Sequence, residues 1–304
     1  MTSNDMPAGA QEPGRDGCAG SPTIVLRSGP ATATIHPSVG GRLGQLDLGR
    51  GPLLRGPSGE VGWSQWGCFP LLPWSNRLPG AVLRFDQIDE HLEVNWPDGS
   101  AIHGLAAACP WEVLDFSGES ALLDVEVSSG PYRVRGMQMF HLQPDRIHLR
   151  LTATNEGDQR VPVGIGIHPW FAAGEVRLPA EQRWPGEPMP TGAPVTVSGA
   201  YDLRASRRPG PMDACFTGLT DTVVDVPGVR LRWDGPVTNV VVYTGEPDWT
   251  CVEPVTMANG AFGLPPDEAK RHGVQVLEPG GSVEVSYCLE AKWPSGQGDL
   301  AVDL

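Results

Sequence analysis

The stretch Arg146–Ala153 reads RIHLRLTA and alternates polar or charged residues with apolar ones. Ser282–Leu289, near the other end of the chain, repeats this alternation as SVEVSYCL. Successive side chains of a β-strand point to opposite faces of its sheet, so a period of two predicts a strand with one buried face and one solvent-facing face. Antiparallel sheets have such faces, and we therefore expect both stretches to be antiparallel strands.

Strand and turn signals continue along the rest of the chain. The 39 glycines and 31 prolines leave little room for long helices, and the only helix-like run is Pro266–Arg271. The continuously apolar Asn239–Tyr243 predicts a strand buried on both faces. Many short strands separated by turns predict an all-β fold, a large sandwich or barrel. Further short alternating runs are Leu123–Val127 and Val229–Trp233.

The chain is expected to form one domain between two tails. Residues 1–21 are rich in Gly, Ala and Pro, have neither a basic start nor an apolar run, and predict a disordered tail rather than a signal peptide. The domain is expected to span 22–293, followed by a C-terminal tail over 294–304. Within the domain, the proline-rich segment 178–206 has little periodicity and predicts a long surface loop.

Composition and charge narrow the classes of partner. The formal net charge is −14 and the pI about 4.8, which disfavours nucleic acids and anionic membrane surfaces. No apolar run approaches the ~18 residues of a membrane-spanning helix. The six cysteines are widely spaced and include no CxxC pair, which is typical of free thiols in a reducing, cytoplasmic setting. We expect a small uncharged molecule as the partner, with the protein a monomer or homodimer.

Two ionisable residues, His168 and Glu253, are each followed by a proline. His168 lies in GIHPWF (166–171) and Glu253 in CVEPVT (251–256). Proline restricts its own backbone and that of the residue before it, so both side chains are predicted to be held in place. A histidine and a carboxylate can transfer protons to and from a neutral substrate. Because the chain has 31 prolines, a proline after an ionisable residue is by itself weak evidence for a functional role.

Other polar residues with neighbouring tryptophans indicate a sugar site. Sugar hydroxyls are met by Asp, Asn and Arg, and apolar sugar faces pack on aromatic rings. HxH, HxxxH and HExxH pairs are absent, which disfavours a metal site. The GxSxG turn of Ser-His-Asp hydrolases and the GxGxxG and GxxxxGK[ST] loops that bind dinucleotides or phosphates are absent too, which disfavours those classes. Each histidine also has the simpler interpretation of a structural residue. The candidates are Asn76 and Arg77 in PWSNRL (73–78), His103 in IHG (102–104), and Asp213 in DACF (213–216).

Taken in order, these motifs resemble the aldose 1-epimerase (galactose mutarotase) family over roughly Gly67–Leu289. The resemblance implies a single domain with an antiparallel β supersandwich fold. It also implies that Glu253 is the general base and His168 the general acid, with His103 orienting the sugar. Arg77, Asp213 and Asn76 would hold hydroxyls, and Trp170 would form a wall of the site. The Asn-His pair that often precedes the family's His-Gly motif is missing from 95–100, which leaves the sugar specificity open.

The expected reaction is interconversion of the α and β anomers of a free aldose, with no metal or organic cofactor. An ionised Glu253 and a protonated His168 coexist best between their ordinary pKa values of about 4.3 and 6.5. Catalysis at neutral pH would therefore need a raised His168 pKa. Two related functions stay open: a hexose-phosphate mutarotase, to which Arg204, Arg207 and Arg208 could contribute, and a non-catalytic sugar-binding protein. A β-sandwich lectin would explain the tryptophans but not the acid–base pair.

Overall fold

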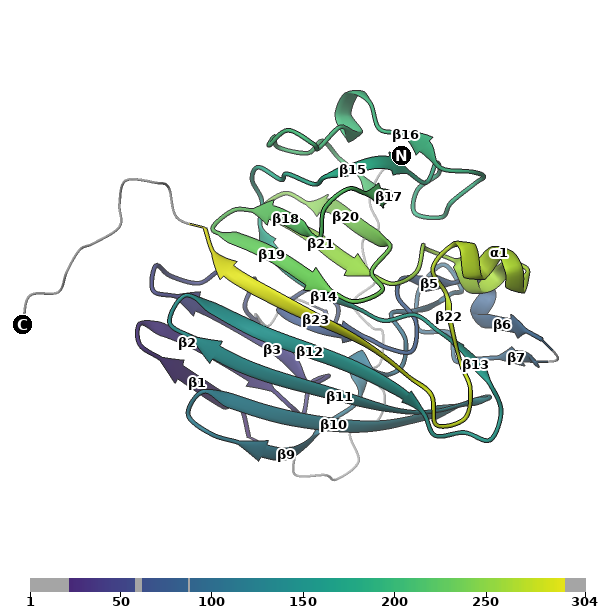
Figure 1. The fold of residues 1–304 in the computed structure, drawn as a ribbon, viewed down its shortest axis with the longest axis horizontal. Helices are drawn as coiled ribbons and strands as arrows, with labels where there is room; N and C mark the ends of the chain where they lie inside the picture. Colours follow the sequence, from purple (N-terminus) through teal and green to yellow (C-terminus); the bar gives the residue numbers. More distant parts are fainter. Residues whose placement is uncertain (1–21, 58–61, 87, 293–304) are drawn as a thin grey trace, which may run out of the picture.

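Two large antiparallel sheets lie one over the other in the computed structural model, which describes residues 22–57, 62–86 and 88–292 (Figure 1). The ten-stranded sheet has the order β1 (Ile24–Ser28), β2 (Ala31–His36), β3 (Arg42–Leu48), β4 (Cys68–Leu71), β14 (Gly166–Ala172), β21 (Trp249–Val255), β20 (Asn239–Glu246), β17 (Asp213–Leu219), β15 (Ala180–Arg183) and β16 (Val195–Thr196). The seven-stranded sheet has the order β18 (Val223–Val226), β19 (Val229–Asp234), β23 (Ser282–Ala291), β12 (Arg146–Asn155), β11 (Tyr132–Gln143), β10 (Ser120–Ser129) and β9 (Glu112–Phe116).

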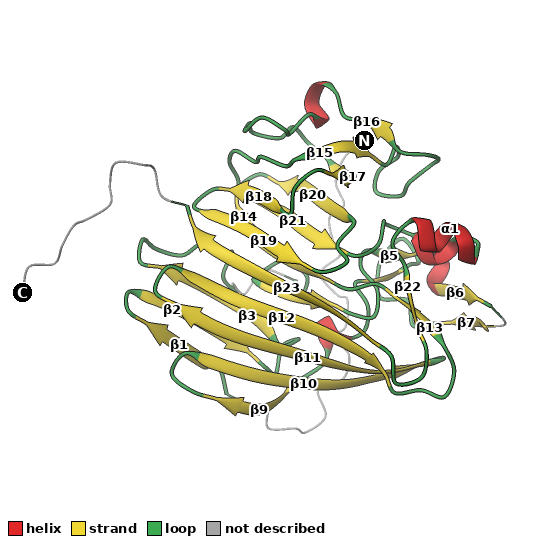
Figure 2. Ribbon diagram, in the orientation of Figure 1, coloured by secondary structure: helices red, strands yellow, loops and turns green. Residues whose placement is uncertain are grey.

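Smaller elements close the ends of the sandwich, and helix is scarce in the described residues (Figure 2). The predicted helix is present as α1 (Pro266–Arg271). Three two-stranded sheets pair β5 (Arg77–Leu78) with β8 (Ala101–Ile102), β6 (Val82–Phe85) with β7 (Ile88–His91), and β13 (Val161–Val163) with β22 (Gln275–Leu277). The 3₁₀ turns are η1 (Pro79–Ala81), η2 (Ala106–Ala108), η3 (Gly199–Tyr201) and η4 (Ala261–Gly263).

The alternating stretches are paired strands, as expected. β12 and β23 are antiparallel neighbours, with Leu149 opposite Tyr287 and Leu151 opposite Val285. Along both strands buried residues alternate with more exposed ones. In β20, the predicted doubly buried strand, the first four residues are all buried.

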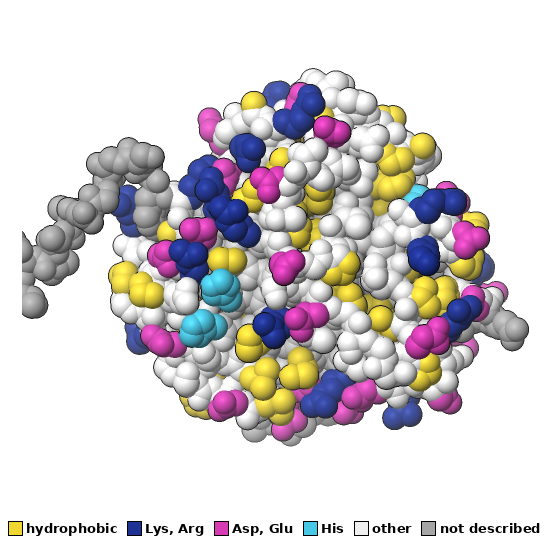
Figure 3. Space-filling model, viewed as in Figure 1, with side chains coloured by type: hydrophobic (Ala, Val, Ile, Leu, Met, Phe, Trp, Pro, Cys, Tyr) yellow, Lys and Arg dark blue, Asp and Glu magenta, His cyan; other side chains and the backbone are white. Residues whose placement is uncertain are grey.

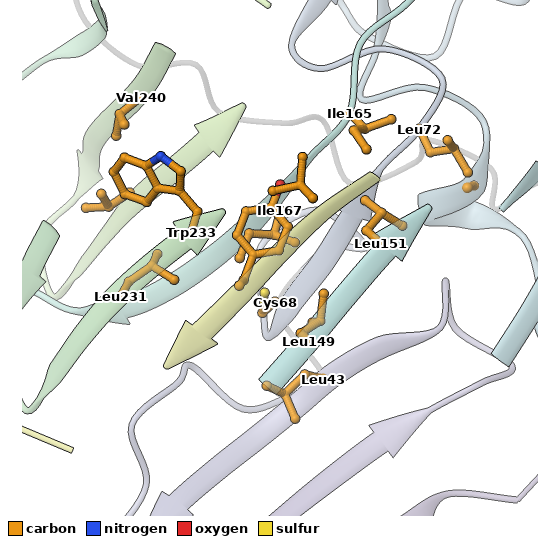
Figure 4. Close-up of a cluster of buried hydrophobic side chains, with 14 of the residues drawn as sticks. Leu43, Cys68, Leu72, Leu149, Leu151, Ile165, Ile167, Leu231, Trp233 and Val240 are labelled. Atoms are coloured by element: carbon orange, nitrogen blue, oxygen red, sulfur yellow. The ribbon is translucent and has the colours of Figure 1, made fainter. Parts of the chain in front are cut away.

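The main core fills the space between the two sheets. In Figure 4, Ile167 and Val240 of the ten-stranded sheet lie near Leu149, Leu231 and Trp233 of the seven-stranded sheet. Burying apolar surface stabilises the layers by about 25 cal/mol per Å². Because side chains alternate along a strand, the neighbours of these core residues, His168 among them, point to the other face of the ten-stranded sheet. The fold thus separates a packing face from a second face that is free to carry chemistry.

The prediction of a long loop over 178–206 was wrong in part. β15 and β16 fall inside it, and β15 extends the ten-stranded sheet by pairing with β17, so that Gln182 lies opposite Thr217. The sequence of β15, AEQR, has no apolar alternation, because this short strand, which lies between β17 and β16, is held mainly by backbone hydrogen bonds to its two neighbours. The predicted tails, 1–21 and 294–304, lie outside the described residues.

The charged side chains of the surface are mixed in sign, and the described cysteines are free, as the widely spaced cysteines of the sequence predicted. Acidic and basic side chains are interspersed on the face shown in Figure 3. The five cysteines in the described part of the chain, Cys68, Cys109, Cys215, Cys251 and Cys288, are free thiols. Among the described residues there is no helix with the length and apolar character needed to cross a membrane.

Candidate active site

His168 and Glu253 lie side by side on the face of the ten-stranded sheet that points away from the core. β14 and β21 run antiparallel with Trp170 opposite Cys251, so two residues further along His168 comes beside Glu253. His168 Nε2 is 3.3 Å from Glu253 Oε1. The two residues are 5% and 2% exposed, so their contact lies in a medium with little water. A titratable pair at hydrogen-bonding distance, shielded from solvent, can exchange a proton directly.

Aromatic rings fix the orientation of the His168 imidazole. Phe69 of β4 stacks on it with the centroids 4.5 Å apart and the planes at 19°. Trp170 faces it at 5.7 Å and 25°, and the Trp170 indole Nε1 donates a hydrogen bond to the Ser64 carbonyl at 2.8 Å. The His103 ring meets His168 edge-on at 4.9 Å. The imidazole is therefore held by packing on several sides.

His103 reaches the site from a strained turn after β8. Its φ is +63°, a left-handed conformation that is uncommon for residues other than glycine. Its backbone N–H donates to the Asn76 carbonyl at 2.9 Å, which ties the two motif loops together. Gly104 follows with φ +73°, and a Cβ there would collide with the Leu72 carbonyl. The His-Gly order of the motif thus follows from the backbone, because the second position has no room for a side chain.

Arg77 and Asp213 form the polar edge of the site. Arg77 Nη1 is 3.7 Å from Asp213 Oδ2, and Arg77 Nε donates to Asp98 Oδ2 at 2.8 Å. Asp213 keeps 25% of its side-chain surface exposed, whereas Arg77 is nearly buried. Asn76 has φ +53°, and its Oδ1 accepts a hydrogen bond from the Arg77 backbone N–H at 2.9 Å. Asn76 therefore shapes the loop that presents Arg77, while its predicted contact with the sugar stays a prediction.

Burial has opposite effects on the two members of the pair. It lowers the pKa of His168 and raises the pKa of Glu253 well above its ordinary value, because a low-dielectric surrounding disfavours both charges. Asp213 raises the Glu253 pKa further, and Arg77 lowers it. The raised His168 pKa that work at neutral pH would need is not found: burial lowers the His168 pKa and raises that of Glu253, so burial favours a proton on Glu253 over one on His168.

Two neighbours of the pair are also perturbed. Burial lowers the pKa of His103 well below its ordinary value, and the charges of His168 and Arg77 add to the effect, so His103 is neutral at physiological pH. Burial raises the pKa of Asp213 to about 6, against the opposing influence of Arg77. Perturbed ionisable groups concentrate at functional sites, because catalysis needs pKa values adapted to its task.

The structure brings the predicted residues together from distant parts of the chain. His168, Glu253, His103, Arg77 and Asp213 form one connected cluster, linked by the contacts above. The partly exposed Trp63 and Tyr243 adjoin it, at Phe69 and Trp170 respectively. Trp170 lies within the cluster as expected, although its indole is already engaged.

Several residues of this cluster were not anticipated from the sequence. Asp98 pairs with Arg77, and Phe69 stacks on His168. Arg42 is fully buried, with its guanidinium 5.1 Å from the Phe69 ring centroid and hydrogen-bonded to the carbonyls of Trp63 and Trp66. No local pattern marks these positions, because their roles depend on which strands and loops become neighbours.

Comparison with known proteins agrees with this architecture. Residues 22–289 match the family model for aldose 1-epimerase. The chain belongs to the aldose 1-epimerase family. Members of this family are isomerases that act on carbohydrates, and the resemblance noted from the motifs is thereby confirmed.

Individual relatives add detail on the fold. A curated Escherichia coli K12 protein of uncharacterised function, YphB, is 34% identical over 122 residues, a match that covers 40% of this chain and 42% of that protein's length. A solved structure from E. coli K12, provisionally named an aldose 1-epimerase, superposes with a TM-score of 0.80 at 23% identity over 90% of this chain and 99% of its own. A galactose mutarotase-like protein from Clostridium acetobutylicum superposes with a TM-score of 0.75 at 17% identity, over 89% of this chain and 95% of its own. At these identities the structures show a shared fold.

Proposed function

We propose that this protein interconverts the α and β anomers of a free, uncharged aldose. The observation that carries the proposal is the buried contact of 3.3 Å between His168 Nε2 and Glu253 Oε1. Together with the polar edge formed by Arg77 and Asp213, this contact supplies an acid, a base and groups that can bind hydroxyls in one cluster. Membership of the aldose 1-epimerase family supports the same reaction.

The proposed chemistry opens and recloses the sugar ring by two proton transfers. Glu253, as carboxylate, takes the proton of the anomeric hydroxyl, while His168, as imidazolium, protonates the ring oxygen. The bond between the anomeric carbon and the ring oxygen breaks, and an aldehyde forms. Rotation about the adjacent carbon–carbon bond presents the other face of the carbonyl. On reclosure both protons return, so that Glu253 and His168 regain their starting states.

Burial of the pair affects the two stages of this cycle differently. Once the ring has opened, Glu253 holds the proton and His168 is neutral, which is the arrangement that burial favours through its effects on the two pKa values. The closed-ring stage has the ionic arrangement, which burial disfavours. Starting the cycle therefore requires a proton to move from Glu253 to His168, and each positioned acid or base contributes about 10²–10⁴-fold to the rate.

The charges around the site favour a neutral sugar over a hexose phosphate. Arg77 is paired with Asp98 and Asp213, and Glu187 accepts a hydrogen bond from the Asp213 backbone N–H at 2.8 Å. A phosphate would face these carboxylates, and like charges repel. Two of the three arginines considered from the sequence are engaged elsewhere: Arg204 pairs with Asp202, and Arg207 donates to the Gly199 carbonyl.

Saturation-transfer NMR of anomer exchange tests the proposal across free aldoses and hexose 6-phosphates. We expect micromolar protein to accelerate exchange of one or more free aldoses and to act weakly on their phosphates at equal concentration. Faster exchange of a phosphate would replace the proposal with the hexose-phosphate alternative. Absence of acceleration for all of them, together with sugar binding, would identify a non-catalytic binding protein.

A further inference from the structure

A third ligand-bearing side chain, Cys251, joins His168 and Glu253. Cys251 precedes Glu253 by two residues in β21, so both side chains point to the same face of the sheet. One ligand atom from each of the three residues lies within 4.8 Å of the others. All three are buried, Cys251 completely. The mechanism proposed above gives the Cys251 thiol no task.

We propose that His168 Nε2, Cys251 Sγ and the Glu253 carboxylate form a site for a thiophilic divalent cation of the zinc class, and that its occupation blocks the proton-transfer pair. Imidazole, thiolate and carboxylate are the ligands that zinc uses, and three protein ligands with one position left open is a common zinc arrangement. Magnesium and calcium prefer all-oxygen sites and would not compete.

The spacing of the ligand atoms suits a tetrahedral ion. Two ligand atoms about 2.1 Å from a tetrahedral zinc are roughly 3.4 Å apart. The His168–Glu253 contact of 3.3 Å already has that length, and the thiol sulfur, which lies within 4.8 Å of both ligand atoms, would move closer to them on binding. Glu253 Oε2 is buried and has no hydrogen-bond partner in the structure, so an unpaired acceptor is available to a cation. Binding would release to solvent both the thiol proton and the proton that burial favours on Glu253.

The chain offers a matched control for the thiol. Cys68 of β4 is as deeply buried as Cys251, but its side chain lies in the core between the sheets, near Ile167 (Figure 4). Replacing Cys68 removes a buried thiol of the same sheet without touching the proposed ligand set. Neither cysteine belongs to the proton-transfer pair.

Titration of reduced, chelator-treated protein with Co²⁺ reads out binding independently of activity. The wild type and Cys68→Ala should develop a near-ultraviolet thiolate-to-cobalt charge-transfer band that saturates at one equivalent, and Cys251→Ala should not. Should Cys251→Ala fold poorly, Cys251→Ser provides the same comparison at nearly constant volume. Absence of the band in the wild type, or its persistence in the Cys251 variants, would overturn the proposed site.

The inhibitory consequence rests on the proposed anomerase function and is measured separately. Zn²⁺ should abolish enzyme-dependent anomer exchange in the wild type, and EDTA should restore it. Without metal, Cys251→Ala should retain its exchange rate, and its half-inhibition should need at least about tenfold more Zn²⁺. Equal inhibition of both proteins, or activation by Zn²⁺, would refute the inhibitory role. If no protein shows exchange, the proposed function fails, while the cobalt band still decides the metal site.

Discussion

Asp213 is the residue at which function and stability are most clearly opposed. It stays partly open to solvent at the polar edge, yet burial raises its pKa to about 6 from an ordinary value of 3.8. Such a carboxyl stabilises the fold while it is protonated, and this stability is lost as the pH rises from 3.8 through about 6. At neutral pH the ionised group costs on the order of 2 kcal/mol, which the fold tolerates at a site for sugar hydroxyls.

Asp213→Asn should therefore make the protein more stable and less active at pH 7. Urea unfolding at pH 7 and pH 4 should show a gain that largely disappears at the lower pH. Asp225→Asn is the matched control of opposite sign: burial alone would raise the Asp225 pKa, but hydrogen bonds from Arg230 and Lys292 lower it. Asp225→Asn should lose stability at pH 7, and an unstable Asp213→Asn would contradict the assigned environment.

The sequence identified much of the site at the residue scale. The five members of the cluster, His168, Glu253, His103, Arg77 and Asp213, each stood in a motif with a physical or family signal. In the sequence, Cys251 stands out only as one of six widely spaced cysteines, whereas the structure shows it both buried and within reach of the pair. Whether a buried thiol is near an imidazole depends on strand register, which one strand's sequence does not contain.

At the scale of elements, the site depends on short turns that present side chains from rigid strands. Strands and the helix Pro266–Arg271 were predictable, because alternation and helix signals are local. The strand Ala180–Arg183 was not, because it joins the sheet through pairing with a strand more than thirty residues away. The turn at His103 and Gly104 is the element most directly coupled to chemistry, since it fixes His103 against His168.

Gly104→Ala tests this turn. Glycines 104 and 99 both have positive φ, so alanine at either position costs about 1–2 kcal/mol of backbone strain. Only at 104 would the new methyl collide with the Leu72 carbonyl, while nothing lies within 4 Å at 99. We expect Gly104→Ala to lose more stability and most of its exchange activity, and Gly99→Ala to keep its activity. Equal effects of the two changes on exchange would contradict the role of the turn.

At the scale of the whole molecule, the sandwich separates stability from chemistry across one sheet. Ile167 points into the core between the layers (Figure 4). His168, the next residue of β14, points to the opposite face. The strand content was readable from the sequence, but the ten-stranded order, in which β4 pairs with β14 and β14 with β21, was not. Such order reflects long-range packing, and the family resemblance indicated the supersandwich architecture but not this order.

Neighbouring substitutions in β14 should therefore have opposite consequences. Ile167→Ala should cost about 2–5 kcal/mol of unfolding free energy, because it leaves a cavity in the core, while the remaining folded protein keeps its exchange rate. His168→Asn should change stability less and remove most of the exchange. Thermal unfolding and NMR exchange on the same samples make the comparison. A reversal, with Ile167→Ala inactive while folded, would show that the two faces are not independent.

In the proposed mechanism, Glu253 exchanges protons with the sugar in partnership with His168. The most direct test is the anomer exchange rate of Glu253→Gln, which keeps the shape of the side chain but cannot take up the proton. Glu290→Gln, the same change in the other sheet, is the control, and circular dichroism verifies both folds. We expect Glu253→Gln to lose about 10²–10⁴-fold of the exchange rate and Glu290→Gln to keep it. A folded Glu253→Gln protein with a near wild-type rate would contradict the proposed mechanism.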